Sequence, residues 1–126
     1  MTGPTRLDQG LARHQRLRQS RLFDETYAQG NKRVGRFMVL WLRAGEGAAL
    51  RLGVVAGRKV GDAVARARAR RRLREVYRRN RSQLAGEFDV ILIARAPVTR
   101  APWDEIVGEF LGLARRAGIV KNDTRS

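Results

Sequence analysis

The sequence of 126 residues contains no cysteine, which excludes disulfide bonds and thiolate metal sites. Its single histidine, His14, lies in a polar and basic N-terminal stretch, where we expect a solvated residue rather than a functional one. No Ser/His/Asp, Cys/His or acidic metal-binding pattern is visible in the chain. We therefore predict no catalytic side chain and no metal site in the protein itself.

Long hydrophobic segments are also missing. No apolar run approaches the ~20 residues that cross a bilayer, and the N-terminus lacks the apolar segment of a signal peptide. We therefore expect a cytoplasmic protein without a membrane partner. Gly53, Gly57 and Gly61 do not follow the spacing of a phosphate-binding loop, so they do not indicate a nucleotide site.

Acidic residues are scarce, with 12 aspartates and glutamates against 27 lysines and arginines and a formal net charge of +15. Only Lys32, Lys59 and Lys121 are lysines. Arginine binds phosphate oxygens bidentately and stacks on bases, so this bias indicates a nucleic-acid partner. The hydrophobic share of 43% favours a folded domain over a disordered basic tail. We expect one RNA-binding domain over residues 1–126, with flexible ends at 1–15 and 119–126.

Hydrophobic periodicity and turn residues indicate the order of the elements. Ser20 and Gly30 are suited to bound a first helix, Asp62 is a suitable N-cap for a second, and Pro102 fits the first turn of a third. The expected helices cover residues 20–29, 62–81 and 102–117, and the expected strands cover 36–43, 50–56 and 89–94. The order is helix, two or three strands, helix, strand, helix, which predicts an α+β sandwich.

The second helix carries nine arginines and one glutamate, Glu75, between Asp62 and Arg81. At about 100° per residue its buried face comprises Ala65, Ala69, Leu73, Val76 and Tyr77. One side carries a row of Arg66, Arg70, Arg74 and Arg78, and the outward arc carries Arg68, Arg71, Arg72 and Arg79. Like charges at such spacings repel by a few tenths of a kcal/mol per pair. This arrangement therefore favours a polyanionic ligand over a merely solvated face.

Two pairs of apolar residues are candidates for a binding surface. Phe23 and Tyr27 are four residues apart, so they share one side of the first helix. Val39 and Trp41 share one face of the strand at 36–43. Each pair fits ordinary core packing, and each also fits a partly open surface that stacks bases. The residues alone leave both interpretations open.

The segment at 51–77, RLGVVAGRKVGDAVARARARRRLREVY, closely resembles the signature of the protein subunit of bacterial ribonuclease P. That family shows an apolar strand, a basic turn, a Gly-Asn pair and then an Arg-Asn-Arg helix. Residues 16–41 continue the pattern with two aromatic residues four apart, a glycine and an Arg-Phe pair before the strand. The segment DVILIARAP at 89–97 resembles the last strand of the family. The similarity covers about residues 16–117.

The resemblance implies an α+β fold of order α-β-β-β-α-β-α, like the second domain of a small-subunit ribosomal protein, with a left-handed βαβ crossover. It implies the protein subunit of an enzyme whose catalytic RNA, with bound Mg²⁺, removes the 5′ leader of precursor tRNA. The implied partners are this RNA and precursor tRNA, without an obligate protein partner. The residues implied to bind the catalytic RNA are Arg58, Lys59, Arg66, Arg68, Arg70, Arg71 and Arg74. Those implied to bind the leader are Phe23, Tyr27, Val39 and Trp41.

The chain departs from the family signature at three positions. Ala67 stands where the family has asparagine between two arginines, Gly57 replaces a serine, and Asp62 replaces an asparagine. These changes concern the fine geometry of RNA contact. Two other functions remain open on the sequence alone. One is a structural RNA-binding protein of ribosomal type, and the other is a basic amphipathic helix that binds an anionic membrane or a calmodulin-like partner.

Overall fold

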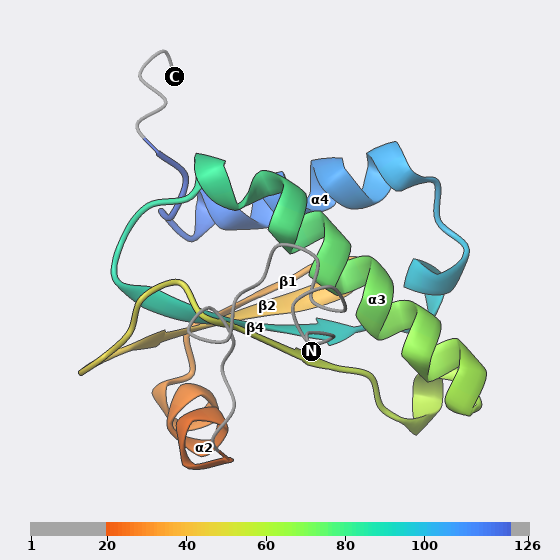
Figure 1. Ribbon diagram of the computed structural model, residues 1–126, viewed down its shortest axis with the longest axis horizontal. Helices are drawn as coiled ribbons and strands as arrows, with labels where there is room; N and C mark the ends of the chain where they lie inside the picture. Colours follow the sequence, from red (N-terminus) through yellow and green to blue (C-terminus); the bar gives the residue numbers. More distant parts are fainter. Residues whose placement is uncertain (1–19, 122–126) are drawn as a thin grey trace, which may run out of the picture.

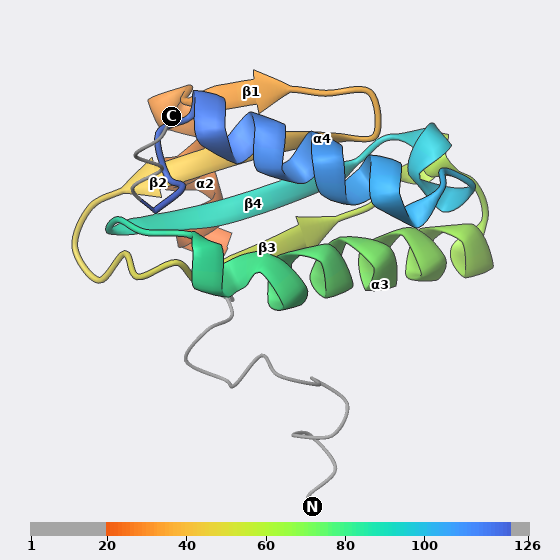
Figure 2. The ribbon, with the colours of Figure 1, turned by 90° about the horizontal axis from the view of Figure 1, so that it is seen from above.

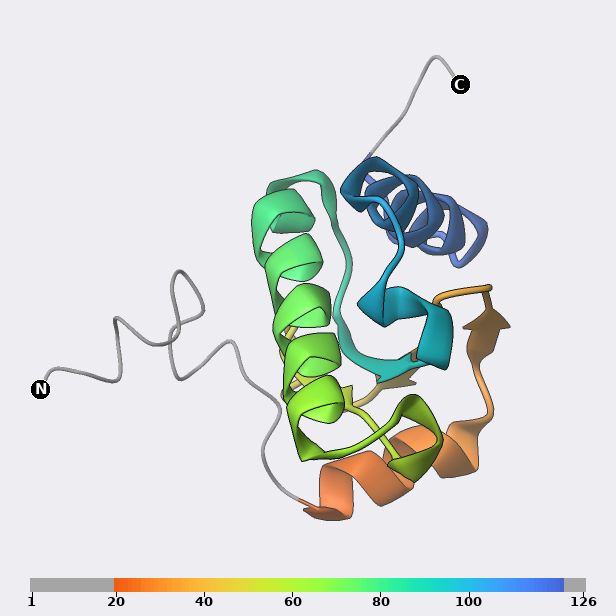
Figure 3. The same ribbon diagram turned by 90° about the vertical axis from the view of Figure 1, so that its right-hand side faces the viewer.

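The computed structural model describes residues 20–121. His14 and the flexible ends expected at 1–15 and 122–126 lie outside the described residues. Within this range a four-stranded sheet is the middle of three layers. Two helices cover one face of the sheet and a third lies against the other face (Figures 1 and 3).

The elements follow the predicted α-β-β-β-α-β-α order, and the predicted α+β class is confirmed. The helices are α2 (Ser20–Gln29), α3 (Ala63–Asn80) and α4 (Trp103–Arg116). The strands are β1 (Lys32–Val34), β2 (Met38–Ala44), β3 (Leu52–Val55) and β4 (Phe88–Ala94). The short 3₁₀ turns are η2 (Arg58–Val60), η3 (Arg81–Gln83) and η4 (Ala96–Thr99). Helices α3 and α4 share one face of the sheet, and α2 lies alone on the other.

The strands follow the order β1-β2-β4-β3 across the sheet, as Figure 2 shows from above. β2 pairs antiparallel with β1 and β4, whereas β3 and β4 are parallel neighbours. The chain leaves β3, passes over the sheet as α3 and returns as β4, and in Figures 1 and 2 this crossover is left-handed. Because nearly all such crossovers are right-handed, the residue pattern alone favours the other hand. Only the family resemblance indicated this one.

The pairing of β2 with β4 decides which side chains face each helical layer. Leu40 pairs with Leu92, and both are buried in the core that α3 and α4 cover. Trp41 pairs with Ile91, and these two pack on the opposite face with Leu22 of α2. Both faces of β2 are therefore covered by helices, as its doubly apolar sequence predicts.

The larger core lies between the sheet and helices α3 and α4. Tyr77 and Phe110 meet there edge to face, with ring centroids 6.0 Å apart. The Tyr77 hydroxyl donates a 2.5 Å hydrogen bond to the carbonyl oxygen of Leu50, whose φ of 59° is left-handed. Burial raises the pKa of Tyr77, so the hydroxyl remains a donor. This bond, together with one from Leu50 N–H to the Phe88 carbonyl, holds the loop before β3.

Helix α3 begins as predicted, because the Asp62 side chain accepts a hydrogen bond from the Ala65 N–H at 2.9 Å. Gly61 has a φ of 143°, and a Cβ atom there would come within 2.8 Å of Ala65, so only glycine fits. The residues of the predicted inner face that are buried are Ala69, Leu73, Val76 and Tyr77. Ala65 is only half-buried, which corrects the prediction. In Figure 1 the first turn of α3 reaches beyond the end of β3, so less of the sheet covers it.

The C-terminal end of the described chain is packed, which corrects the expected flexible end from residue 119. Ile119 is fully buried in the core. Val120 pairs with Leu84, and the Lys121 N–H donates to the Gln83 carbonyl oxygen at 2.7 Å. Residues 119–121 therefore belong to the folded domain, because the apolar pair at 119 and 120 reaches back to the turn after α3.

Candidate nucleic-acid interface

Helix α3 has two chemically different flanks, and one of them is occupied by contacts within the protein. Arg72 donates hydrogen bonds to the carbonyl oxygens of Val98, Thr99 and Ala101 at 3.2, 3.2 and 2.9 Å. Arg68 donates to the Thr99 carbonyl oxygen at 3.0 Å. Burial lowers the pKa of Arg72, and the nearby charge of Arg68 acts in the same direction. Arg72 thus ties α3 to η4, and its predicted place on the outward arc is wrong.

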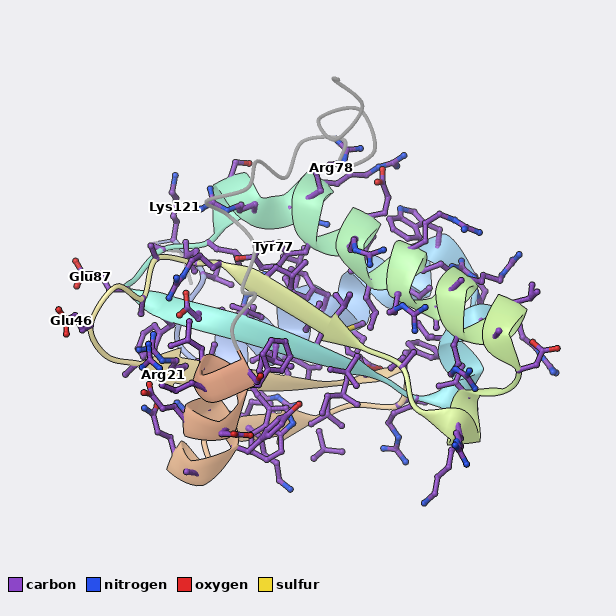
Figure 4. All side chains as sticks on the ribbon, turned by 60° about the horizontal axis from the view of Figure 1, so that its bottom comes forward. Arg21, Glu46, Tyr77, Arg78, Glu87 and Lys121 are labelled. Carbon is purple, nitrogen blue, oxygen red and sulfur yellow. The ribbon has the colours of Figure 1, made fainter. Side chains whose placement is uncertain are left out.

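The C-terminal half of α3 contains its own ion pairs. Glu75 accepts hydrogen bonds from Arg78 at 2.5 Å and from Arg79 at 2.6 Å. The bond from Arg78 is the main cause that lowers the pKa of Glu75. Arg79 also lies 5.4 Å from the centre of the Trp103 ring. In Figure 4, Arg78 points away from the sheet while Tyr77 points toward it. Part of the positive charge at this end is therefore balanced within the protein.

The other cations of α3 lie on the flank turned away from α4 and continue into η2 (Figure 2). We call this surface the arginine face, and it comprises Arg58, Lys59, Arg66, Arg70, Arg71 and Arg74. Three of these side chains are exposed and three are half-buried. Arg66 donates to the Gly61 carbonyl oxygen at 3.1 Å, which holds it beside η2. Of the residues implied to bind the catalytic RNA, Arg68 alone lies elsewhere, about 160° round the helix from Arg70.

On the opposite face of the sheet, α2 and β2 bring three aromatic rings together. The ring centroids of Phe23 and Tyr27 are 6.5 Å apart and those of Tyr27 and Trp41 are 5.0 Å apart, both edge to face. Tyr27 is 36% exposed, and the other two are half-buried. Burial, followed by the charge of Asp24, raises the pKa of Tyr27. We call the three rings the aromatic cluster. Val39 lies on the same face of β2 and is half-buried, so the four predicted leader residues share one surface.

The structure adds residues to this surface that the sequence analysis misses. Val55 and Ile93 are half-buried and pack with Phe23 and Trp41. Lys32 pairs with Trp41 across β1 and β2, and its Nζ lies 5.1 Å from the centre of the Trp41 ring. Strand register brings these residues together, and periodicity within one strand does not reveal it. The surface therefore combines rings suited to bases with a cation suited to phosphate.

A buried ion network holds α2 against the sheet. Asp89 of β4 is fully buried and accepts hydrogen bonds from Arg51 at 3.0 and 2.8 Å and from Arg43 at 2.8 Å. Two backbone N–H groups also donate to this carboxylate. Arg43, with 4% of its side chain exposed, donates in turn to Glu25 of α2 at 2.7 Å. These contacts connect β4 through β2 to α2, the helix that carries two of the aromatic rings.

The network shifts the pKa of both carboxyl groups. Burial acts to raise the pKa of Asp89, but the hydrogen bonds from Arg51, from backbone N–H groups and from Arg43 outweigh it and lower the pKa. The hydrogen bond from Arg43 lowers the pKa of Glu25. Both groups are therefore ionised at neutral pH, and the network pairs two carboxylates with two guanidinium groups.

Gly53 of β3 lies directly against the Phe23 ring, because a Cβ atom at this position would overlap the ring. Gly53→Val is expected to push Phe23 out of the aromatic cluster and to lower the free energy of unfolding by ~1–3 kcal/mol. Urea denaturation measures this loss. Gly57→Ser is the matched control, because Gly57 has a φ of −86° and open space at its Cβ position. Equal losses in both variants would contradict the contact.

The described residues define what this surface does chemically. Within residues 20–121 no group of three or more histidine, aspartate or glutamate residues is placed to hold a metal ion. In the same range no helix is both long enough and apolar enough to cross a bilayer. Leu73 and Val76 are buried, so the apolar face of α3 is not available to a membrane or a calmodulin-like partner. The fold and its two surfaces are those of a basic α+β domain that binds RNA.

Sequence comparison gives the family. The model of the ribonuclease P family matches residues 11–118. The ribonuclease P protein component of Symbiobacterium thermophilum is 35% identical over 109 residues, which cover 86% of this chain and 95% of that protein. The ribonuclease P protein component of Syntrophomonas wolfei is 27% identical, with 86% and 92% covered. The chain belongs to the ribonuclease P protein family, the protein subunits of the ribonuclease P that acts in tRNA processing.

Two solved structures share the fold. The ribonuclease P protein from Thermotoga maritima matches with a TM-score of 0.71 at 30% identity, covering 80% of this chain and 96% of that one. The ribonuclease P protein from Staphylococcus aureus matches with a TM-score of 0.73 at 24% identity, covering 85% and 98%. These matches confirm the fold expected from the family resemblance.

Proposed function

We propose that this protein binds the catalytic RNA of ribonuclease P through its arginine face and the 5′ leader of precursor tRNA through its aromatic cluster. The observation that carries the proposal is the position of the two surfaces on opposite sides of β3. Helix α3 passes on one side of this strand, and Phe23 packs against Gly53 on the other. An RNA docked on the arginine face therefore holds its substrate within reach of the aromatic cluster.

In this proposal the protein binds and positions, and the RNA subunit performs the cleavage. The RNA holds the Mg²⁺ ions, which activate water and stabilise charge at the cleaved phosphate. The arginine face neutralises phosphates of the folded RNA. The aromatic cluster stacks unpaired leader bases, each contact being worth ~1–3 kcal/mol. The protein thereby favours precursor over mature tRNA and broadens the range of precursors cleaved. Its cytoplasmic location stays a prediction.

Cleavage of precursor tRNA by the catalytic RNA, with and without this protein at low Mg²⁺, tests the proposal. The protein is expected to increase the cleavage rate, because its cations supply part of the charge neutralisation that Mg²⁺ supplies at high concentration. An unchanged rate at every Mg²⁺ concentration would overturn the proposal. That result would leave a structural role of ribosomal type, which requires the arginines but no half-exposed aromatic cluster.

Phe23→Ala and Trp41→Ala are each expected to weaken binding of precursor tRNA to the holoenzyme about tenfold or more, because each removes a stacking contact. Binding of mature tRNA is expected to be unchanged, since mature tRNA has no leader. Filter binding with both tRNAs measures the difference. Val34→Ala is the control, because Val34 is 53% exposed on β1 and outside the cluster. Equal losses for the two tRNAs would assign the rings to packing alone.

A further inference from the structure

A cleft of about 490 Å³ lies where η2, η4, the start of α4 and the turn before β2 meet. Its volume is within the ~300–1,000 Å³ of small-molecule sites. The lining includes three apolar and three charged residues, which are Val60, Pro97, Pro102, Arg36, Arg100 and Glu105. The three charged residues are exposed at its mouth. The cleft is separate from the aromatic cluster and shares no residue with it.

This cleft is continuous with the arginine face. Val60 ends η2, directly after the two cations of that turn. Thr99 also lines the cleft, and its carbonyl oxygen accepts hydrogen bonds from Arg68 and Arg72 of α3. An RNA bound along α3 and η2 therefore passes the mouth of the cleft.

The carboxylate of Glu105 decides which part of an RNA fits. Within residues 20–121 Glu105 forms no ion pair, although two arginines line the same cleft. A carboxylate repels a phosphate, so a surface that contacted only the RNA backbone gains nothing from it. The same group accepts hydrogen bonds from the amino group of cytosine or the imino and amino groups of guanine. The apolar walls fit the faces of such a base, and the arginines fit its phosphates.

We propose that this cleft binds one unpaired nucleotide of the catalytic RNA, a guanine or a cytosine. Glu105 accepts hydrogen bonds from the base edge, and Arg36 and Arg100 contact the flanking phosphates. Val60 and the two prolines enclose the base. This inference rests on the proposed binding of the catalytic RNA, and it gives that complex a contact that reads a base in addition to contacts that neutralise charge.

The direction of one effect tests the proposal. Glu105→Gln keeps the side-chain size and removes a negative charge from a surface that faces RNA. If the cleft meets only phosphates, the variant binds the catalytic RNA as tightly as wild type or more tightly. If the carboxylate accepts hydrogen bonds from a base, the variant binds about 5- to 20-fold more weakly. Asp104→Asn is the matched control, because Asp104 is an exposed acid in the same turn of α4 and does not line the cleft.

A second pair of variants tests the arginines. Arg36→Ala combined with Arg100→Ala is expected to weaken RNA binding about tenfold more than Arg115→Ala combined with Arg116→Ala. The second variant loses the same charge at the other end of α4. Chemical probing of the RNA is expected to show one unpaired guanine or cytosine that wild-type protein protects and the first variant leaves reactive.

Weaker binding by Glu105→Gln, with binding by Asp104→Asn unchanged or tighter, supports the proposal. Binding by Glu105→Gln as tight as wild type or tighter overturns it, and so does an Arg36/Arg100 loss no larger than its control. Circular dichroism melting of each variant checks that the fold is retained. A wild-type protein that fails to bind the catalytic RNA would instead overturn the proposed function itself.

Discussion

Asp89→Asn is expected to lower the free energy of unfolding by about 3–5 kcal/mol, because it leaves two arginines without their shared buried partner. Only 4% of the Arg43 side chain is exposed, so water does not replace the lost carboxylate charge. An exposed ion pair contributes far less, about 0–1 kcal/mol. Urea denaturation measures the loss, and hydrogen exchange is expected to accelerate most in α2, which the network holds against the sheet.

Glu87→Gln is the matched control for this prediction. Glu87 is an exposed acid two residues before Asp89, and Figure 4 shows it at the loop end, away from the core. Its replacement is expected to change stability by less than about 0.5 kcal/mol. A loss below about 1 kcal/mol in Asp89→Asn would show that the buried network does not hold α2 in place.

The same carboxylate predicts a pH dependence of stability. The pKa of Asp89 is lowered in the folded protein from an ordinary value near 3.8. Its ionised form therefore stabilises the fold above that value, and the contribution is lost as the pH falls through the lowered pKa. Asp89→Asn is expected to lose the corresponding part of the acid sensitivity. Glu25 and Glu75 also have lowered pKa values and keep the remainder. An equally steep acid transition in the variant would contradict this assignment.

Arg70→Ala combined with Arg74→Ala is expected to weaken binding of the catalytic RNA by about 10- to 100-fold at physiological salt. Each lost phosphate contact releases fewer counterions, so the slope of log affinity against log salt is expected to become shallower by about 1 per arginine. Filter binding over a salt series measures both quantities. The affinity loss is expected to shrink at high salt, where the electrostatic contribution is screened.

The control for the arginine face is Arg115→Ala combined with Arg116→Ala, which removes two arginines from the exposed end of α4. This control is expected to retain most of the affinity and slope. An unchanged salt slope in the Arg70/Arg74 variant would mean that the arginine face does not contact phosphates. Cleavage assays at saturating RNA then show whether any remaining loss concerns assembly or substrate.

Local patterns in the chain predict the elements that depend on local physics. The cap formed by Asp62 and the glycine before it define the start of α3, because both act within one helical turn. The alternation in β2 predicts two covered faces. β1 was assigned no bounds from the sequence, because Lys32–Val34 is three residues long and mostly polar. That strand exists through its pairing with β2.

The candidate site was predicted in its parts and not in its arrangement. Each predicted leader residue lies on the shared surface, since helical and strand periods place them on defined faces. The role of Asp89 was missed, because an aspartate at the start of an apolar strand resembles a cap. Its partners Arg51 and Arg43 are 38 and 46 residues away in the sequence. Arg72 was misplaced for the same reason, since its carbonyl partners lie 26 to 29 residues away.

The sequence by itself determined the element order, the excess of arginine over acid, and the absence of cysteine chemistry. It also carried the family signature that indicated the hand of the crossover. Only the tertiary structure decided which arginines remain available and which are spent on internal carbonyl or carboxylate groups. It alone placed the arginine face and the aromatic cluster on opposite sides of β3. The physical reason is that caps and periodicity act over one or two turns, whereas register, docking of η4 on α3 and the Asp89 network join residues distant in the sequence.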